Sequence, residues 1–245
     1  MMNVFMSFLS PRAFDLDRCR DLSETPCIMK TTIALFSALS LICFGLLPKV
    51  TAVSPPPDGG YPGGNTAEGQ NALFSRTSGS YNTAIGLNAL YSDVSGSQNT
   101  AMGVNALSRN TTGNYNTAGG INTLYRNTIG VQNTANGVQA LFNNTTGNFN
   151  TANGVNALYH NTTGFQNTTA GQQALFNNTE GIANTANGVS ALYLNNGNNN
   201  TAIGFQALNN SITGDLNTAL GAHAGYNITM ASNVICIGTN LPGRT

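Results

Sequence analysis

Hydrophobic and polar positions repeat along this chain with a period of 17 residues. The motif Asn-Thr-x-x-Gly occurs ten times, and eight of the nine steps between successive copies are 17 residues long. The remaining step, from Asn184 to Asn200, is one residue shorter. A fixed short period is the signature of a solenoid, in which each repeat forms one coil that buries its apolar side only by stacking on its neighbours.

The repeat unit reads N-T-A-x-G-x-x-A-L-(F/Y)-x-N-x-T-G-x-x, and its positions are numbered from the Asn. Positions 1, 2 and 5 keep Asn, Thr and Gly in all ten copies. Stacked coils turn each position into a column of like side chains, as in cross-β ladders. The expected ladder residues are Asn82, Asn99, Asn116, Asn133, Asn150, Asn167, Asn184, Asn200, Asn217, Gly86, Gly103, Gly120, Gly137, Gly154, Leu90, Leu107, Leu124, Leu141, Leu158, Leu175 and Leu192.

These columns predict an all-β-leaning fold, a parallel β-solenoid or β-roll of about ten coils. The segment N-T-A-x-G reads as a short strand. The limb from position 6 to position 10 stays open between a second short strand and a single helical turn, because its apolar residues follow the i, i+3, i+4 spacing of a helix. The N-x-T-G segment that follows is a turn in either case.

We expect the interior to be filled by Leu at position 9 and by the apolar residues at position 6. The position-6 residues are Leu87, Val104, Ile121, Val138, Val155, Val189 and Phe205. A thin rod of such coils leaves one apolar side exposed, and we expect the Phe and Tyr column at position 10 to form it. A homotrimer would bury this side, since large exposed apolar patches mark interfaces.

The region before the repeats reads as an export signal followed by a linker. Residues 29–52 combine a basic start, an apolar run of about 15 residues and small residues at the end, which predicts a secretory signal peptide. The alternative is an uncleaved membrane anchor, although a spanning helix needs ~20 apolar residues. Residues 1–28 read as a disordered or wrongly assigned extension, residues 53–64 as a Pro/Gly linker, and residues 65–245 as the solenoid.

Charge and cysteine content narrow the function. From Val53 onward there are four basic and five acidic residues, a net charge near −1, and nucleic-acid binding needs a basic surface instead. Three of the four cysteines precede Val53, so Cys236 has no partner for an intrachain disulfide in the mature chain. We expect Cys236 to be a buried small hydrophobic residue.

Candidate catalytic and metal-binding residues are sparse after the leader. The two histidines, His160 and His223, lie 63 residues apart, and we expect His160 to be a solvated turn residue. Glu180 and Asp215 are the candidate pair for acid–base catalysis, but they fall two coils apart at different repeat positions. The acids of a calcium β-roll and the clustered ligands of a zinc site do not occur. The sequence therefore predicts no enzyme, no cofactor and no metal.

The threonine column at position 2 is the surface feature with the most regular chemistry. In register, its hydroxyls would form a row spaced by ~4.8 Å, which could order water or ice. The alternative is that threonine simply suits strands. The row comprises Thr66, Thr83, Thr100, Thr117, Thr134, Thr151, Thr168, Thr185, Thr201 and Thr218.

The repeats resemble those of a known family. The sequence N-T-A-I-G at 82–86 and 200–204, recurring with A-L-Y/F and N-T-T-G, resembles the head repeats of trimeric autotransporter adhesins. The similarity is greatest to the longer-repeat variety of bacterial surface and phage-fibre proteins, and it covers about residues 65–240. It implies a left-handed parallel β-roll, a homotrimer and attachment to a host-surface or matrix receptor. The endosialidase-type chaperone domain of related fibres, with its serine–lysine centre, is absent from this sequence.

Together these features predict a non-enzymatic secreted or cell-surface repeat protein that acts as an adhesin head, a stalk or a fibre segment. A phage-type tail fibre segment is one alternative, and an ice- or surface-binding solenoid that uses the threonine row is another. We expect membrane contact only through the leader, if it stays uncleaved.

Overall fold

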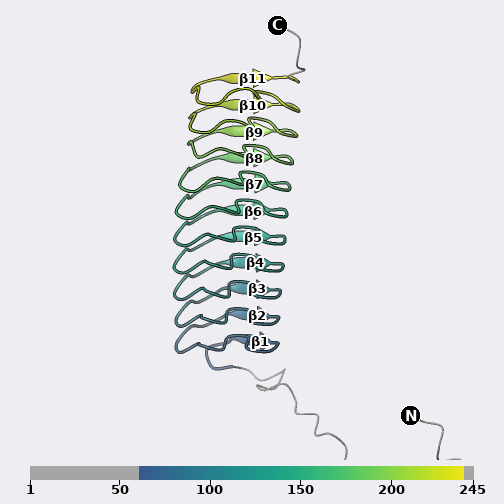
Figure 1. Ribbon diagram of the computed structural model, residues 1–245. Helices are drawn as coiled ribbons and strands as arrows, with labels where there is room; N and C mark the ends of the chain where they lie inside the picture. Colours follow the sequence, from purple (N-terminus) through teal and green to yellow (C-terminus); the bar gives the residue numbers. More distant parts are fainter. Residues whose placement is uncertain (1–60, 240–245) are drawn as a thin grey trace, which may run out of the picture. The chain divides into compact units, whose positions relative to one another are not determined.

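The structure, a computed structural model, describes residues 61–239 (Figure 1). The predicted signal peptide at 29–52, the extension at 1–28 and the greater part of the linker lie outside the described residues, as do residues 240–245.

Eleven strands of three residues each form one parallel sheet in sequence order, and Figure 1 shows them stacked in a nearly straight file. They are β1 (Thr66–Glu68), β2 (Thr83–Ile85), β3 (Thr100–Met102), β4 (Thr117–Gly119), β5 (Thr134–Asn136), β6 (Thr151–Asn153), β7 (Thr168–Ala170), β8 (Thr185–Asn187), β9 (Thr201–Ile203), β10 (Thr218–Leu220) and β11 (Ile235–Ile237). The predicted parallel β-solenoid of about ten coils is confirmed, with β11 as an eleventh strand beside β10.

The sheet register places like residues over like. Thr83 pairs with Thr100, and the alanines that follow them pair in the same way. The short repeat keeps this register, because Thr185 still pairs with Thr201. Each strand from β1 to β10 buries its central residue and turns the side chains of positions 2 and 4 outward, as the two-residue period of a strand requires.

The second limb forms neither a strand nor a helical turn. In the coil that starts at Asn133, two consecutive turns close with bonds from Ala140 N–H to Gly137 O (3.3 Å) and from Asn144 N–H to Leu141 O (3.2 Å). The φ angles of Gln139 and Leu141 are +57° and +50°. A positive φ at every second residue is incompatible with a β-strand and with a helical turn, the two elements that the sequence left open. These residues instead turn the backbone back towards the strand of the same coil.

Fewer apolar side chains fill the interior than the sequence predicted. Leu at position 9 and Ala at positions 3 and 8 are buried in nearly every coil. The position-6 residues were expected to join them, and this prediction is wrong: Leu87, Val104, Ile121, Val138, Val155, Val189 and Phe205 are 37–48% exposed. The physical reason is that two columns of asparagine, at positions 1 and 12, occupy the space beside the leucines.

In the short coil, a side-chain oxygen takes the place of a backbone carbonyl oxygen as hydrogen-bond acceptor. In a regular coil, one carbonyl oxygen at position 13 accepts three backbone N–H groups from the preceding coil, as Thr162 does at 3.0–3.2 Å. In the short coil, Asn196 Oδ1 accepts the N–H groups of residues 179–181 at 2.8, 2.9 and 3.3 Å. The side chain therefore replaces the missing backbone acceptor, whereas the buried Asn178 Oδ1 of the neighbouring coil is left without a hydrogen-bond partner.

Replacing Asn196 with Ala should destabilise this junction. The change removes the acceptor of three N–H groups in a partly exposed site, so we expect a loss of about 1–2 kcal/mol in the free energy of unfolding. Urea unfolding followed by circular dichroism measures it. Asn187→Ala is the matched control, because Asn187 is exposed at position 4, where Ala170 stands one coil earlier. Equal unfolding midpoints for the two variants would contradict the stabilising role of Asn196 as the acceptor of these N–H groups.

Candidate functional site

An asparagine column at position 1 runs through the interior of the rod. The backbone N–H of Asn133 donates to Asn116 Oδ1 (3.0 Å), and Asn133 Oδ1 accepts the N–H of Asn150 (3.0 Å). Asn133 Nδ2 donates to Gly147 O across the same coil (2.8 Å). Each of these asparagines therefore joins three coils and closes its own coil from side to side.

A second asparagine column, at position 12, was missed from the sequence, where this segment was read only as a turn. Asn127 Nδ2 donates to Asn110 Oδ1 (2.8 Å) and to Gly130 O (3.0 Å), and the pattern repeats up to Asn178. The carbonyl oxygen at position 15 thus accepts two side-chain amides, from positions 1 and 12. A Cβ on Gly130 would lie 2.4 Å from Asn127 Oδ1, which explains the glycine at this position.

Asp93 replaces asparagine in this second column and is fully buried. Its carboxylate accepts hydrogen bonds from Asn110 Nδ2 (2.8 Å) and from Asn82 Nδ2 (3.3 Å). Burial raises the pKa of the Asp93 carboxyl from 3.8 to about 7, although hydrogen bonds from Asn110 and from the Gly96 backbone and the charge of Arg76 oppose this shift. Asp93 is a titratable group at neutral pH in a structural position.

The glycine and leucine columns adopt unusual backbone angles. The five glycines from Gly86 to Gly154 have φ between +127° and +141°. A Cβ on Gly137 would lie 2.6 Å from Gly154 O, because successive coils touch through their backbones at this position. The seven ladder leucines from Leu90 to Leu192 have φ of +49° to +53° and are fully buried. These columns hold the coils together and leave no reactive group.

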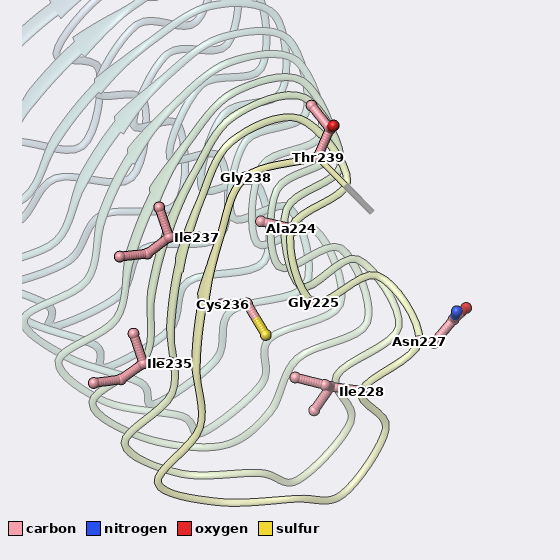
Figure 2. Close-up of a pocket in the computed structure, with 9 residues that line it drawn as sticks. All are labelled: Ala224, Gly225, Asn227, Ile228, Ile235, Cys236, Ile237, Gly238 and Thr239. Carbon is pink, nitrogen blue, oxygen red and sulfur yellow. The ribbon is translucent and has the colours of Figure 1, made fainter. Parts of the chain in front are cut away.

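A cavity of about 400 Å³ lies at the C-terminal end of the solenoid. Figure 2 shows Cys236 pointing into the coil near Ile228, whereas Ile235 and Ile237 point away from it. Cys236 is a free thiol and is only half-buried, so the expected burial is incomplete. The lining contains no acid, base or histidine. The cavity lies on the end face of the last described coil, where a further coil would stack.

Asp215 and the two histidines have structural contacts. Asp215 Oδ1 accepts the backbone N–H of Asn198 (2.6 Å), in place of an amide or hydroxyl oxygen in other coils. His160 was expected to be solvated, but it is half-buried with its ring edge-on to Tyr159 and Phe176, at 4.8 and 5.0 Å. Within residues 61–239 the structure shows no cluster of three His, Cys, Asp or Glu residues that could hold a metal ion.

Three regular columns reach the outer surface. The position-10 rings are stacked face to face, with centroids 5.1–5.3 Å apart from Tyr125 to Tyr193. The exposed position-6 residues form an apolar stripe, defined as Leu87, Val104, Ile121, Val138, Val155, Val189 and Phe205. The position-2 threonines are exposed or half-buried, and within the described part no protein group forms a hydrogen bond with the hydroxyls from Thr83 to Thr151.

In the described residues the structure contains no helix of the length and apolarity that crossing a membrane requires. Comparisons with protein-family models, with curated proteins and with solved structures find no match to this chain.

Proposed function

We propose that this chain is a non-enzymatic secreted or cell-surface rod, which serves as an adhesin head, a stalk or a fibre segment. The observation that carries the proposal is the stack of eleven in-register strands with regular exposed columns along its length. Such a surface acts through many weak contacts in series, which raise avidity without a deep pocket. The resemblance of the repeats to trimeric adhesin heads supports the same role.

The apolar stripe supports self-association as a homotrimer. Five consecutive coils, from Leu87 to Val155, each expose one apolar side chain at position 6. A partner with the same 17-residue period can place an apolar group against each of them, and a second copy has that period. Three parallel rods with their stripes on a common axis would bury all three stripes. The resemblance favours three subunits over two.

Polar residues in the stripe should separate the subunits. In the variant Val104→Gln, Val138→Gln, Val155→Gln, the coil itself should persist, because Gln70 and Gln172 occupy the same position naturally. We expect the wild-type chain to sediment as a trimer and the variant as a monomer, with the same far-ultraviolet circular dichroism. Glutamine at position 14, in place of Thr112, Thr146 and Thr163, is the matched control. A monomeric wild type, or a variant that remains trimeric, would refute the assembly.

A phage-type tail fibre segment is the rival within the same structural class, because a rigid trimeric rod serves both roles. Structural phage genes beside the gene for this chain would favour it.

Ice binding is the rival from another class, and the unpaired threonine hydroxyls favour it. The row from Thr83 to Thr151 has no protein partner, so its hydroxyls are available to ordered water. The outward residue at position 4 varies from Met102 through Gly119 to Asn136, so the flat face is only one residue wide. Thermal hysteresis of the full chain would support this rival.

A further inference from the structure

Position 17 alternates between an aromatic residue and glutamine over six consecutive coils. The residues are Tyr81, Gln98, Tyr115, Gln132, Phe149 and Gln166. The three rings are 69%, 58% and 52% exposed, whereas the rings at position 10 from Tyr91 to Tyr226 are half-buried and only Phe74 among them is exposed. All six residues have φ between +56° and +60°, so the backbone presents them in the same way.

The spacing of these three rings is regular. Neighbours are two coils apart, which corresponds to ~9.6 Å at ~4.8 Å per strand. A glutamine separates each pair, and within residues 61–239 none of the three rings stacks on another aromatic ring. Figure 1 shows the strands that follow these residues stacked in a nearly straight file, so the backbone positions that carry the rings recur along one direction. Their faces are therefore open to a linear ligand.

The surroundings of the rings are uncharged and mostly polar, with Val131 and Phe165 at position 16 as the apolar exceptions. The three glutamines are exposed, and their amides form no hydrogen bond within the described part. The threonine row lies two residues further along each coil and adds one free hydroxyl per coil. Positions 16, 17, 1 and 2 carry no charged residue between Ser80 and Thr168. A ligand for this surface is therefore neutral and rich in hydroxyl groups.

We propose that the row of Tyr81, Tyr115 and Phe149 binds an extended, neutral β-1,4-linked glycan. In such a chain each sugar is turned over relative to the previous one, so equivalent ring faces recur once per disaccharide, a length close to two coils. The C–H face of every second sugar packs on an aromatic ring, and the glutamine amides and threonine hydroxyls bond the hydroxyls between them. This inference rests on the proposed role as a surface rod and names the class of its ligand.

Two other linear ligands fit the surface less well. Single-stranded nucleic acid also stacks on aromatic rows, but it needs a positively charged track, and this row has no charge. A polyproline II peptide repeats at about 9.3 Å, which is three residues of 3.1 Å. Such peptides dock in aromatic-lined grooves, whereas these rings are each more than half exposed, and such a peptide would leave the glutamines and threonines unused.

Binding of defined oligosaccharides to the full chain tests the proposal. Isothermal titration with cellohexaose and chitohexaose should give saturable binding, and α-1,4-linked maltohexaose, whose sugars do not alternate, should bind at least tenfold more weakly. The variant Tyr81→Gln, Tyr115→Gln, Phe149→Gln places in each site the residue found one coil later at the same φ. We expect its affinity for the β-linked sugars to fall by about tenfold or more. Leu216→Gln, at position 17 outside the row, should bind as the wild type does.

The outcomes separate this inference from the proposed function. A trimeric, β-rich wild type that binds neither β-linked hexasaccharide would overturn the inference and leave the rod intact. Glycan binding that the triple variant retains, or a row that binds a proline-rich peptide in place of the sugars, would overturn it as well. A shift of the triple variant from trimer to monomer would assign the row to self-association and also count against it. Absence of β-structure in the wild type would remove the rod itself.

Discussion

The variant Gly137→Ala is expected to lose about 4 kcal/mol of unfolding free energy. The added Cβ would lie 2.6 Å from Gly154 O and 2.7 Å from Gly154 C, so one coil must move away from the next. The φ of +130° is also a conformation that alanine avoids. Urea unfolding measures the loss.

Gly119→Ala is the matched control, because it adds the same methyl group at position 4 of the preceding coil. Its Cβ would approach only the end of the Asn136 side chain, and Ala170 stands at the same position naturally. We expect a change of no more than about 0.5 kcal/mol. Because solenoid coils are stabilised by their neighbours, Gly137→Ala should also split the transition into two steps. Two variants of equal stability would show that the coils do not touch at position 5.

Stability should decrease as the pH rises, and Asp93→Asn should remove this dependence. The pKa of Asp93 is about 7 in the folded chain and near 3.8 when unfolded, so the folded state binds a proton that the unfolded state has lost. The stabilising contribution is complete below about pH 4 and is lost as the pH rises through about 7. One pKa unit corresponds to about 1.4 kcal/mol, so we expect a loss of about 2–4 kcal/mol, allowing for relaxation around the charge.

At pH 8 the Asp93→Asn variant should therefore be more stable than the wild type by the same amount. An amide fits this place, since Asn110 to Asn178 fill it in the next five coils. Asp215→Asn, which removes a carboxylate at a half-buried position, is the matched control for the loss of one acidic side chain. Denaturant unfolding at pH 4, 6 and 8 compares the three proteins. A wild-type stability that is constant or rises over this range would refute the buried, neutral carboxyl.

The strand and the stacking direction could be predicted from the sequence, because every coil repeats the same residues. The repeat keeps Asn, Thr, Ala and Gly at fixed positions. Only one strand register places identical residues of successive coils next to each other, and the structure has this register. The short repeat could be counted, but its repair by Asn196 could not. Only the fold shows that an amide oxygen reaches the place of the missing carbonyl.

The second limb could not be predicted because its backbone is unusual. A sequence of Ala and Leu favours a helix or a strand, whereas Leu141 adopts a φ of +50° that leucine seldom takes. The hydrogen bonds to the adjacent coils and the burial of the leucine column outweigh this preference. The buried asparagine columns take up the interior beside the leucines, which is why an apolar residue such as Val138 misled the assignment of the core.

The burial of Asp93 was hidden for a related reason. From the sequence, Asp93 is one of several isolated acids, and the asparagines at its repeat position resemble ordinary turn residues. Their inward direction follows from the Gly carbonyl that they share with the position-1 asparagines, as Asn127 and Asn116 share Gly130 O. The alternation of rings and glutamines at position 17 is visible in the sequence, but only the exposure in the fold gives it a functional meaning.

Distances between spin labels along the rod test the stacking of coils most directly. In a chain whose cysteines are replaced by serine, and diluted with unlabelled chain, labels would be attached at position 4 of chosen coils. At ~4.8 Å per coil, the pair Glu68 and Asn153 should be about 24 Å apart, and the pair Glu68 and Leu220 about 43 Å apart. Distances that grow in proportion to the number of coils are the predicted result. Distances that do not increase between these two pairs would contradict the solenoid and the function inferred from it.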